Sequence, residues 1–419
     1  MQAHGVATAL RQALTYLSKR LRREAPTTVP PVKSGVKRAG YLGPIWATLA
    51  QQNAFHMMQA PMVNCKRRKI AIIGDLNLVQ CRKYRVEQLI ELWATMGVDV
   101  TFSHYQDVPR AVHILQDATH LMCYRLQMCA DVSMYLYEAR RLKMPILYDI
   151  DDPLFSVSAY ETYTNLTVLN PVMKSDLVAA APGYLDVMNA CDAISVSTPG
   201  LALHASEYSH RDVFVRRNFA DSVTLNSGEV ALRGRVDNED VFRMSFASGS
   251  QGHEADFDII RNQIIAFLSK DKNRRLMILG HFDRKHLPSD ISDQIEYHKF
   301  TNYDRYLQTL AQSDCAVVPL ADDLFNRCKS AVRAIDAASV GVPVVCGNIG
   351  DFTNIVVQGQ TGIIATKESD WETALDCFDR DRSTAHAMGL RARCALEKNW
   401  SAQNTPHIVD PNLVKWVTA

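Results

Sequence analysis

The sequence predicts an α/β fold made of two doubly wound, Rossmann-like domains. Short apolar segments alternate with segments of helical spacing, the alternation pauses near residues 221–240, and it then restarts over a similar length. Strands that alternate with helices form right-handed βαβ units and a parallel sheet. A domain takes about 100–200 residues, so the 419 residues of this chain accommodate two domains and an extension.

The first alternating region begins at Lys69, where the run KIAIIG is typical of a buried parallel strand. The strands expected there are Lys69–Gly74, Val98–Phe102, His120–Cys123, Pro145–Tyr148 and Ala193–Ser197. The helices expected between them are Tyr84–Met96, Tyr135–Arg141 and one that ends with Leu185–Asn189. Ligands of two such domains bind at the carboxyl ends of the strands, in a cleft between the domains.

The second alternating region follows the pause and repeats the same pattern. Its expected strands are Val241–Ala247, Leu276–Gly280, Cys315–Pro319, Val342–Cys346 and Gly362–Ala365. Its expected helices are Phe257–Leu268, Tyr303–Gln312, Ser330–Val340 and Trp371–Phe378. We therefore predict four parts: a basic N-terminal extension (1–64), a first Rossmann-like domain (65–230), a second one (231–399), and a tail (400–419) that packs back on the first domain.

The charge of the chain is unevenly distributed, although its net value is only +1. Residues 1–68 hold eleven Lys or Arg and one acid, Glu24, whereas the remainder is mildly acidic. The body therefore gives no electrostatic reason to expect nucleic acid as a partner. Residues 1–24 fit an amphipathic, Arg-rich helix, and three interpretations stay open: a plain extension, a contact with anionic lipid, or an organellar transit peptide.

Other classes of protein are excluded by composition. No apolar run approaches the ~18–20 residues that cross a bilayer, and no secretory signal opens the sequence. The ten cysteines are scattered, with no CxxC pair and no zinc spacing. We expect reduced, buried thiols in a cytoplasmic protein, and neither a metal nor a cofactor.

The segment 319–350 carries the strongest chemical signal. A polar loop leads into a helix expected to open near Lys329 and Ser330, where outward-pointing amides favour an anion. Arg333 and Asp336 follow at spacings that place them on the same helix face. This arrangement suits a nucleoside diphosphate, with cations on the phosphates and Asp336 on a ribose diol; a capped helix with an Arg333–Asp336 ion pair is the structural alternative.

A second polar turn follows the first strand of the second domain. Ser248, Gly249 and Ser250 expose backbone amides that can cradle a diphosphate. His253 could donate a hydrogen bond to a phosphate or leaving-group oxygen. The alternative is a turn in which His253 and Asp256 cap the next helix.

Three acids end the strand at Pro145–Tyr148, namely Asp149, Asp151 and Asp152. They could hold a metal, bind an acceptor or assist acid–base catalysis, or simply cap a loop; we favour acceptor contact through Asp151 or Asp152.

A basic segment follows the first expected strand and has two interpretations. Arg82, Lys83, Tyr84 and Arg85 could contact a phosphate of the donor or the acceptor, or form a solvated face.

These segments resemble the family-four retaining GT-B glycosyltransferases, a resemblance that spans roughly residues 69–400. The donor segment of that family reads N-x-x-K-S-x-x-K-x-x-E-x-x-x-x-G-x-P-V-V. At the corresponding positions this chain has Asn326, Lys329, Ser330, Arg333, Asp336, Gly341, Pro343, Val344 and Val345. Four further segments resemble motifs of the family and occur in the same order along the chain: Cys81–Arg85, Tyr148–Asp152, Ser195–Leu201 with Arg217–Asp221, and Ser248–Asp256. The chain departs from the pattern at Arg333 and Asp336, which replace Lys and Glu, and at Cys328, where many relatives carry a Glu.

The resemblance implies a GT-B enzyme that moves a sugar from a nucleotide-sugar to a hydroxyl acceptor, with retention, without a metal, and in glycan or polysaccharide synthesis. The first domain would bind a glycan or lipid-linked acceptor, and the second would bind the donor. The site residues implied are His253, Asp151 and Asp152 for catalysis, and Arg82, Tyr84 and Arg85 for the acceptor or a phosphate. The donor residues implied are Ser248, Gly249, Ser250, Asn326, Lys329, Ser330, Arg333 and Asp336.

Two other functions stay open at this stage. One is a non-catalytic GT-B module that binds a sugar nucleotide or a partner protein, which the departures at Cys328 and Asp336 favour. The other is a sugar-nucleotide epimerase or hydrolase of the same fold. The basic extension adds the hypothesis that the protein contacts the inner face of a membrane through residues 1–24.

Overall fold

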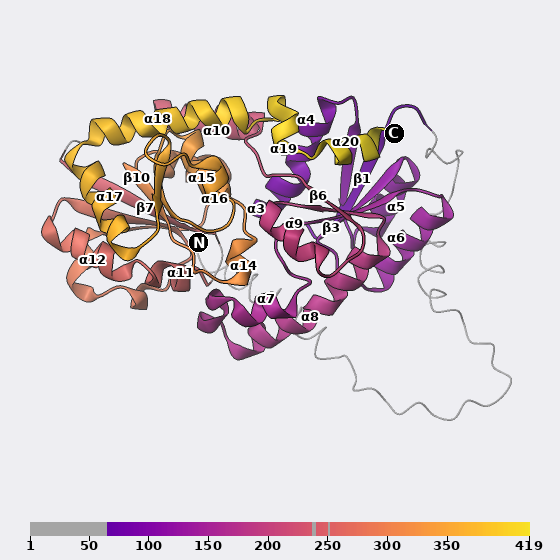
Figure 1. Ribbon diagram of the computed structural model, residues 1–419, viewed down its shortest axis with the longest axis horizontal. Coiled ribbons are helices and arrows are strands. Elements are labelled where there is room, and N and C mark those ends of the chain that lie inside the picture. Colours follow the sequence, from indigo (N-terminus) through magenta and orange to yellow (C-terminus); the bar gives the residue numbers. More distant parts are fainter. Residues whose placement is uncertain (1–64, 237–239, 250–251) are drawn as a thin grey trace, which may run out of the picture. The chain divides into compact units, whose positions relative to one another are not determined.

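The protein is described by a computed structural model over residues 65–236, 240–249 and 252–419. It contains two six-stranded parallel sheets flanked by helices, ordered β2-β1-β3-β4-β5-β6 and β12-β11-β10-β7-β8-β9 (Figure 1). The predicted pair of doubly wound sheets is confirmed. The basic extension, including the helix expected in residues 1–24, lies outside the described residues.

The first lobe is the sheet β1–β6 with helices α3–α9. Its strands are β1 (Lys69–Gly74), β2 (Asp99–His104), β3 (His120–Tyr124), β4 (Ile146–Ile150), β5 (Ala193–Val196) and β6 (Asp212–Val215). Its helices are α3 (Val79–Arg82), the π-helix η2 (Lys83–Glu87), α4 (Gln88–Ala94), α5 (Val108–Gln116), α6 (Ala130–Arg141), α7 (Val157–Thr162), the 3₁₀ helix η3 (Thr164–Val168), α8 (Pro171–Ala190) and α9 (Pro199–Ser206).

The second lobe is the sheet β7–β12 with helices α10–α18. Its strands are β7 (Phe242–Ser248), β8 (Arg274–Gly280), β9 (Ile295–His298), β10 (Cys315–Val318), β11 (Val344–Gly347) and β12 (Gly362–Ala365). Its helices are α10 (Ser222–Arg233), α11 (Glu254–Asp258), α12 (Arg261–Lys270), η4 (Arg284–His286), η5 (Ser289–Gln294), α13 (Tyr303–Leu310), α14 (Leu324–Arg327), α15 (Val332–Ser339), α16 (Phe352–Ile355), α17 (Glu368–Arg380) and α18 (Arg382–Asn399).

The central strands are apolar on both faces because helices cover both sides of each sheet. In β1, Ala71 and Ile73 pack into one core cluster, whereas Ile70 and Ile72 pack into the other. Such alternation follows from the two-residue period of a strand. Since all paired strands are parallel, their carboxyl ends meet at one edge of each sheet, and the polar residues that follow the strands gather there.

Two strands, β6 and β9, were not predicted. Several helices were also missed, among them α5, α7, α9, α10, α14, α16, α18 and those after residue 400. The strands β6 and β9 lie at sheet edges and are largely half-buried, so their apolar pattern is weak. Helix α10 falls within the region 221–240 that lacks clear periodicity; Asp221 caps it by accepting a hydrogen bond from the backbone N–H of Thr224 at 2.9 Å. Helix α15 begins at Val332 rather than at Ser330, so Ser330 precedes the helix.

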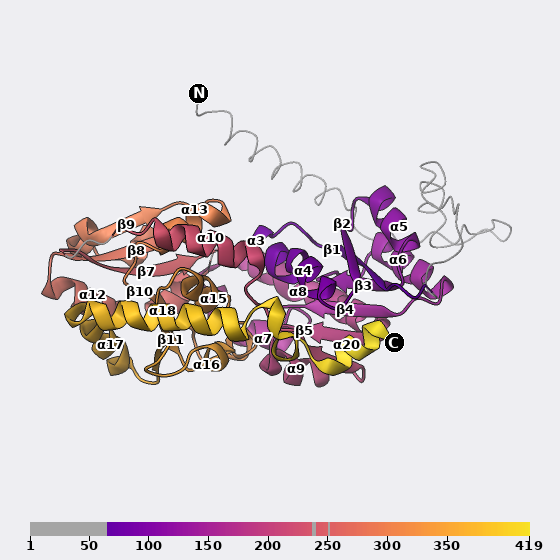
Figure 2. The same cartoon turned by 90° about the horizontal axis from the view of Figure 1, so that it is seen from above.

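The last part of the chain lies against the first lobe. It comprises η6 (Ala402–Asn404), α19 (Thr405–Ile408) and α20 (Pro411–Thr418), drawn in yellow in Figures 1 and 2. The backbone N–H of Asp410 donates to the Val215 carbonyl at 2.9 Å, and that of Arg217 donates to Ile408 at 2.7 Å. Leu413 and Val417 join the same core cluster as Ile70.

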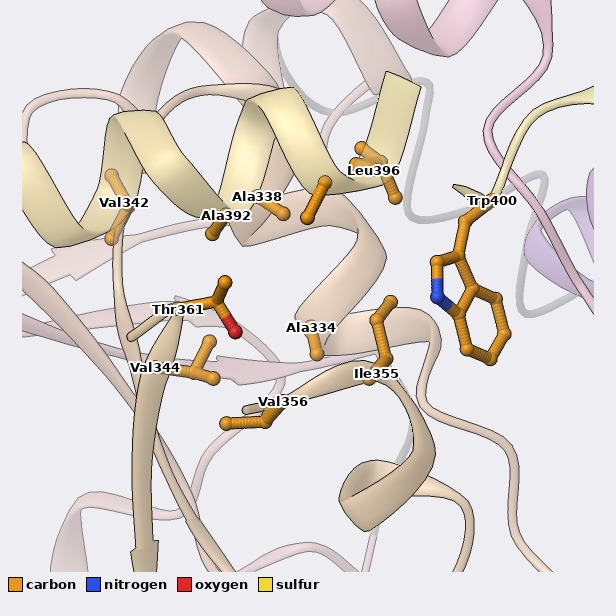
Figure 3. Close-up of a pocket in the computed structure, with 11 residues that line it drawn as sticks. Ala334, Ala338, Val342, Val344, Ile355, Val356, Thr361, Ala392, Leu396 and Trp400 are labelled. Atoms are coloured by element: carbon orange, nitrogen blue, oxygen red, sulfur yellow. The ribbon is translucent and has the colours of Figure 1, made fainter. Parts of the chain in front are cut away.

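A small apolar cavity lies beneath α18 (Figure 3). Its lining comes from α15, α18 and the segment around Val356, and Trp400 closes one end. Thr361 provides the hydroxyl drawn in Figure 3, whereas Ala334, Ala338 and Leu396 offer only methyl groups. The cavity therefore lacks the charged groups that the sequence predicts for the functional site. Among the described residues, no helix is both long and apolar enough to cross a membrane.

Candidate active site

Lys329 lies where the two lobes meet, between α14 and α15. Its Nζ donates a 2.7 Å hydrogen bond to the hydroxyl of Tyr163 from the first lobe and lies 4.8 Å from the centre of that ring. Burial alone would lower the pKa of Lys329, but Tyr163, Asp256 and Asp152 raise it above its ordinary value. The ammonium therefore stays charged at a junction that also contains carboxylates.

Arg333 adds a second cation in the first turn of α15. Its Nη1 is buried and has no hydrogen-bond partner among the described residues. Burial lowers the pKa of Arg333, although the group remains a cation at neutral pH. A buried guanidinium nitrogen without a partner is costly unless an anion satisfies it.

His253 and Asp256 form a pair beside these two cations. The Nδ1 of His253 lies 2.8 Å from Asp256 Oδ2, and Asn165 of the first lobe donates to the same oxygen at 2.8 Å. The second oxygen of Asp256, Oδ1, is buried and has no hydrogen-bond partner among the described residues. The alternative of a plain turn is thereby weakened, because the first lobe supplies a side chain that holds Asp256.

The state of the imidazole follows from its surroundings. Burial, aided by Lys329 and Arg333, lowers the pKa of His253 to about 4 despite the opposing effect of Asp256. Burial would raise the pKa of Asp256, but His253 and Lys329 lower it to about 2. At pH 7 the pair is thus a neutral imidazole and a carboxylate, so Nδ1 carries the proton and Nε2 accepts hydrogen bonds. Donation from Nε2, as the sequence suggested, requires the ring to be protonated first.

The other residues that the sequence predicts to bind the donor differ in their burial and in their hydrogen bonds. Among the described residues, a side chain added at Gly249 would meet nothing within 4 Å, so the backbone at the end of β7 is not covered by them. The Ser248 side chain is buried, and Ser250 lies outside the described residues. Asn326 is buried, and its Oδ1 has no hydrogen-bond partner in the described part of the chain, whereas Ser330 accepts a 2.8 Å hydrogen bond from Asn218 of the first lobe.

Asp151 and Asp152 approach the same junction from the end of β4. Arg125 Nη1 lies 2.9 Å from Asp151 Oδ1 and 3.5 Å from Asp152 Oδ2. Burial and the neighbouring Asp151 raise the pKa of Asp152, while Arg125 and Lys329 oppose that shift. The structure therefore brings Asp152 under the influence of the second-lobe cation. Among the described residues, no cluster of three or more His, Cys, Asp or Glu has metal-binding geometry.

Arg85, one of the two arginines expected to contact phosphate or acceptor, is engaged elsewhere, which corrects that expectation. Arg85 is fully buried and makes a two-pronged pair with Asp149, at 2.9 and 2.6 Å. Arg216 pairs with the same carboxylate at 3.2 Å. Arg82 forms an ion pair with Glu87 at 2.7 Å. Arg85 thus supports the core of the first lobe, because an arginine with no exposed surface cannot reach a ligand.

Asp336 also differs from the expected open ribose contact. Its carboxylate accepts hydrogen bonds from the hydroxyls of Tyr84, across the lobe junction, and of Tyr303, the latter at 2.6 Å. Burial raises the pKa of Asp336, and the two tyrosine hydroxyls counteract that shift. Lys83 covers this centre and hydrogen bonds to Thr224 at 2.6 Å. Tyr84 is therefore a bridge to Asp336 rather than an exposed phosphate contact.

Cys328, at the position where many relatives carry a glutamate, packs against the first lobe. The Cys328 side chain belongs to the first-lobe core cluster, and its carbonyl accepts a 2.8 Å hydrogen bond from Thr198. At Gly200 an added Cβ would lie only 2.5 Å from the Arg327 carbonyl oxygen. A charged side chain at position 328 would thus be buried against apolar groups, which agrees with a cysteine at this place.

Four residues of this site were not assigned to it from the sequence. Tyr163 and Asn165 come from η3 and its flank, where no motif marks them. Tyr303 had been placed only as the start of a helix. Arg125 offered one usable signal, since it directly follows β3, and the residue after a parallel strand is where ligand contacts gather.

The second lobe matches a known family. Residues 246–377 match the family model described as "Glycosyl transferases group 1". The D-inositol 3-phosphate glycosyltransferase of Nocardia farcinica (strain IFM 10152) is 29% identical over 104 residues, which are 24% of this chain and 22% of that protein. The protein of the same description from Arthrobacter sp. (strain FB24) is 27% identical over 115 residues, 26% of each chain. The matches thus span about a quarter of the length of these curated relatives.

Solved structures are similar over most of the chain. Sucrose-phosphate synthase from Thermosynechococcus elongatus has a TM-score of 0.54 and 13% identity, covering 81% of this chain and 96% of that one. Anabaena Alr3699/HepE, in complex with UDP and glucose, has a TM-score of 0.52 and 12% identity, covering 84% of this chain and all of that one.

The similar structures show the GT-B fold, and within it residues 246–377 match the Glycosyl transferases group 1 model. The resemblance to family-four GT-B glycosyltransferases is thereby confirmed.

Proposed function

We propose that this protein is a glycosyltransferase that moves a sugar from a nucleotide-sugar donor to a hydroxyl group of an acceptor. The observation that carries the proposal is the pair of half-buried cations at the lobe junction, Lys329 and Arg333. The Nη1 of Arg333 is itself buried and has no hydrogen-bond partner among the described residues. Two cations in one junction suit a diphosphate, which needs charge-assisted hydrogen bonds from several directions.

The reaction can be followed bond by bond. The acceptor O–H bond breaks, a bond forms between the acceptor oxygen and the anomeric carbon, and the bond between that carbon and the diphosphate oxygen breaks. The electron pair leaves with the nucleoside diphosphate, where Lys329 and Arg333 stabilise the developing charge. In the front-face route, which retains the anomeric configuration, the acceptor proton passes to the departing phosphate oxygen.

Two groups would orient the reacting sugar and the acceptor. The neutral His253 presents Nε2 as an acceptor for a hydroxyl, because Asp256 holds the proton on Nδ1. Asp152, at the end of β4, faces Lys329 across the junction and would accept a hydrogen bond from the acceptor hydroxyl. We assign no metal or cofactor to the reaction.

The donor is proposed to be a UDP-sugar, on the basis of the UDP and glucose named for HepE. A thermal-shift panel of UDP-, GDP- and dTDP-sugars with the full chain tests this, since a bound ligand stabilises the folded state. Lys329→Met should abolish the shift, and Lys398→Met, at an exposed position of α18, should retain it. A shift that survives Lys329→Met would contradict the proposed donor site.

Transfer itself requires product analysis with hydroxyl acceptors. Transfer to an acceptor supports the proposal, whereas hydrolysis without an acceptor would indicate a sugar-nucleotide hydrolase, and binding without turnover would indicate a non-catalytic module. The anomeric proton coupling in the NMR spectrum of the product tests retention.

The proposal also covers the acceptor and the place in the cell where the protein acts. We propose a glycan or lipid-linked acceptor in polysaccharide synthesis, in the cytoplasm, with residues 1–24 contacting the inner face of a membrane. Sedimentation with anionic vesicles tests the contact, because a basic amphipathic helix binds such surfaces. Equal binding by the full chain and by a chain without residues 1–64 would contradict it.

A further inference from the structure

Arg125 has an unusual backbone for its residue type. It directly follows β3 and adopts a φ of 50°. The left-handed region is strained for a residue with a side chain, and the surrounding structure must offset that strain. The backbone N–H of Arg125 donates to the Asp149 carbonyl at 2.9 Å, which ties this conformation to the end of β4.

That backbone conformation directs the guanidinium toward three groups. One nitrogen, Nη1, lies 2.9 Å from Asp151 Oδ1, 3.5 Å from Asp152 Oδ2 and 3.5 Å from the Cys81 sulfur. The Arg125 side chain is 14% exposed, and those of Asp151 and Asp152 are 11% and 26% exposed. One cation thus serves two carboxylates, and Asp152 is the more accessible of the two.

Asp152 is surrounded by charges from both lobes. From the first lobe it faces Asp151, Arg125 and Arg85, and from the second lobe it faces Lys329. Cys328, which also lies near Asp152, is buried and holds its proton, because burial raises the pKa of its thiol. Lys329 is expected to be occupied by the donor diphosphate. Arg125 is then the cation left to hold Asp152.

We propose that Arg125 is a positioning residue for glycosyl transfer, and that its guanidinium holds Asp151 and Asp152 so that Asp152 meets the acceptor hydroxyl. The inference rests on the proposed function. Asp151, with the closer contact, anchors the guanidinium, while Asp152, with the longer contact and greater exposure, keeps a free oxygen for the acceptor. The left-handed backbone is what aims the guanidinium at both carboxylates.

The experiment compares variants that fit the same backbone. Arg125→Asn removes the guanidinium and keeps a residue that tolerates a positive φ. Lys143→Asn is the matched control, because Lys143 also has a positive φ, 56°, and lies exposed between α6 and β4. Arg125→Lys keeps the charge without the planar group and should rescue part of the effect.

The expected result is a change in the pH profile of kcat/KM. An opposite charge within about 4–6 Å lowers a carboxyl pKa by about 1–3 units. Losing Arg125 should therefore move the acidic limb to higher pH by at least about one unit. The donor KM should stay within about twofold of the unmodified enzyme. Lys143→Asn should leave the profile unchanged.

A second readout separates this inference from the proposed function. Carboxyl ¹³C NMR of labelled aspartate, with Asp152→Asn for assignment, follows the titration of Asp152 without any turnover. An upward pKa change in Arg125→Asn supports the positioning role even if no acceptor is found. An unmoved Asp152 titration, or an activity loss that only follows the folded fraction, would overturn it.

Discussion

Two carboxylate centres end the same strand, β4, and differ in how completely they are satisfied. Asp149 receives Arg85 at 2.9 and 2.6 Å, Arg216 at 3.2 Å, and the Ser195 hydroxyl at 2.7 Å, with no exposed surface. Asp151 and Asp152, two and three residues further along the chain, share a single arginine, Arg125, and remain partly exposed.

The difference separates a structural centre from one with binding capacity. Burial would raise the pKa of Asp149, but Arg85 and Arg216 hold it below its ordinary value. The pKa of Asp152 is instead raised by burial and by Asp151. A fully paired buried carboxylate has no lone pair left for a ligand, whereas a partly paired one does. Asp149 and the pair Asp151–Asp152 look alike in the sequence, and they differ in how many hydrogen bonds and ion pairs their carboxylates receive.

The largest effect is expected from breaking the complete centre. Asp149→Asn leaves two buried guanidinium groups without their counter-charge, and removing one partner of a buried pair costs about 3–5 kcal/mol. Urea unfolding of the full chain measures this loss. The comparison variant Asp152→Asn should cost less than about 1 kcal/mol, because its carboxylate is partly exposed. Equal losses at the two positions would contradict the distinction.

A third carboxylate, Asp336, is paired by neutral tyrosine hydroxyls rather than by arginines, and one of these hydroxyls comes from across the lobe junction. Tyr84→Phe keeps the ring and removes the hydroxyl that donates to Asp336. A hydrogen bond to a charged group contributes about 1.5–3 kcal/mol, so the free energy of unfolding should fall by about that amount. Tyr303→Phe is the matched control within the second lobe and should cost a similar amount. A loss below about 0.5 kcal/mol for Tyr84→Phe would mean that this contact contributes little.

A pH-dependent effect is expected at Asp351, whose only ion-pair partner among the described residues, Arg217, lies at 3.8 Å. Burial raises the pKa of Asp351 to about 6, although Asn354 and Arg217 oppose the shift. The folded state thus binds a proton that the unfolded state has already released between about pH 4 and 6. Stability from this group is present below pH 4 and is lost as the pH rises through about 6.

The variant Asp351→Asn should remove that pH dependence. Its free energy of unfolding should exceed that of the unmodified protein at pH 7.5 and match it near pH 4, as measured by urea unfolding at each pH. A variant that is less stable at pH 7.5 would indicate that the ion pair with Arg217, at 3.8 Å, outweighs the cost of burying the charge.

Much of the fold could be predicted from the sequence because it depends on local patterns. Runs such as KIAIIG at β1 are apolar on both faces, which only a sheet covered on both sides accommodates. The strands β6 and β9 were missed because an edge strand is half-buried and need not be strongly apolar. The helix α10 was missed because much of its surface faces solvent.

The sequence by itself determined which residues could bind an anion, since the charges of Lys329 and Arg333 and their position after a strand are local properties. Only the tertiary structure decided which charges are free to bind. Arg85 and Arg333 look alike in the sequence, yet Arg85 pairs with Asp149 in the core, whereas Nη1 of Arg333 has no hydrogen-bond partner in residues 65–236, 240–249 and 252–419. Pairing depends on residues far away along the chain, such as Asp149 for Arg85 and Asn165 for Asp256, because contacts between distant segments form only when the sheets and lobes pack.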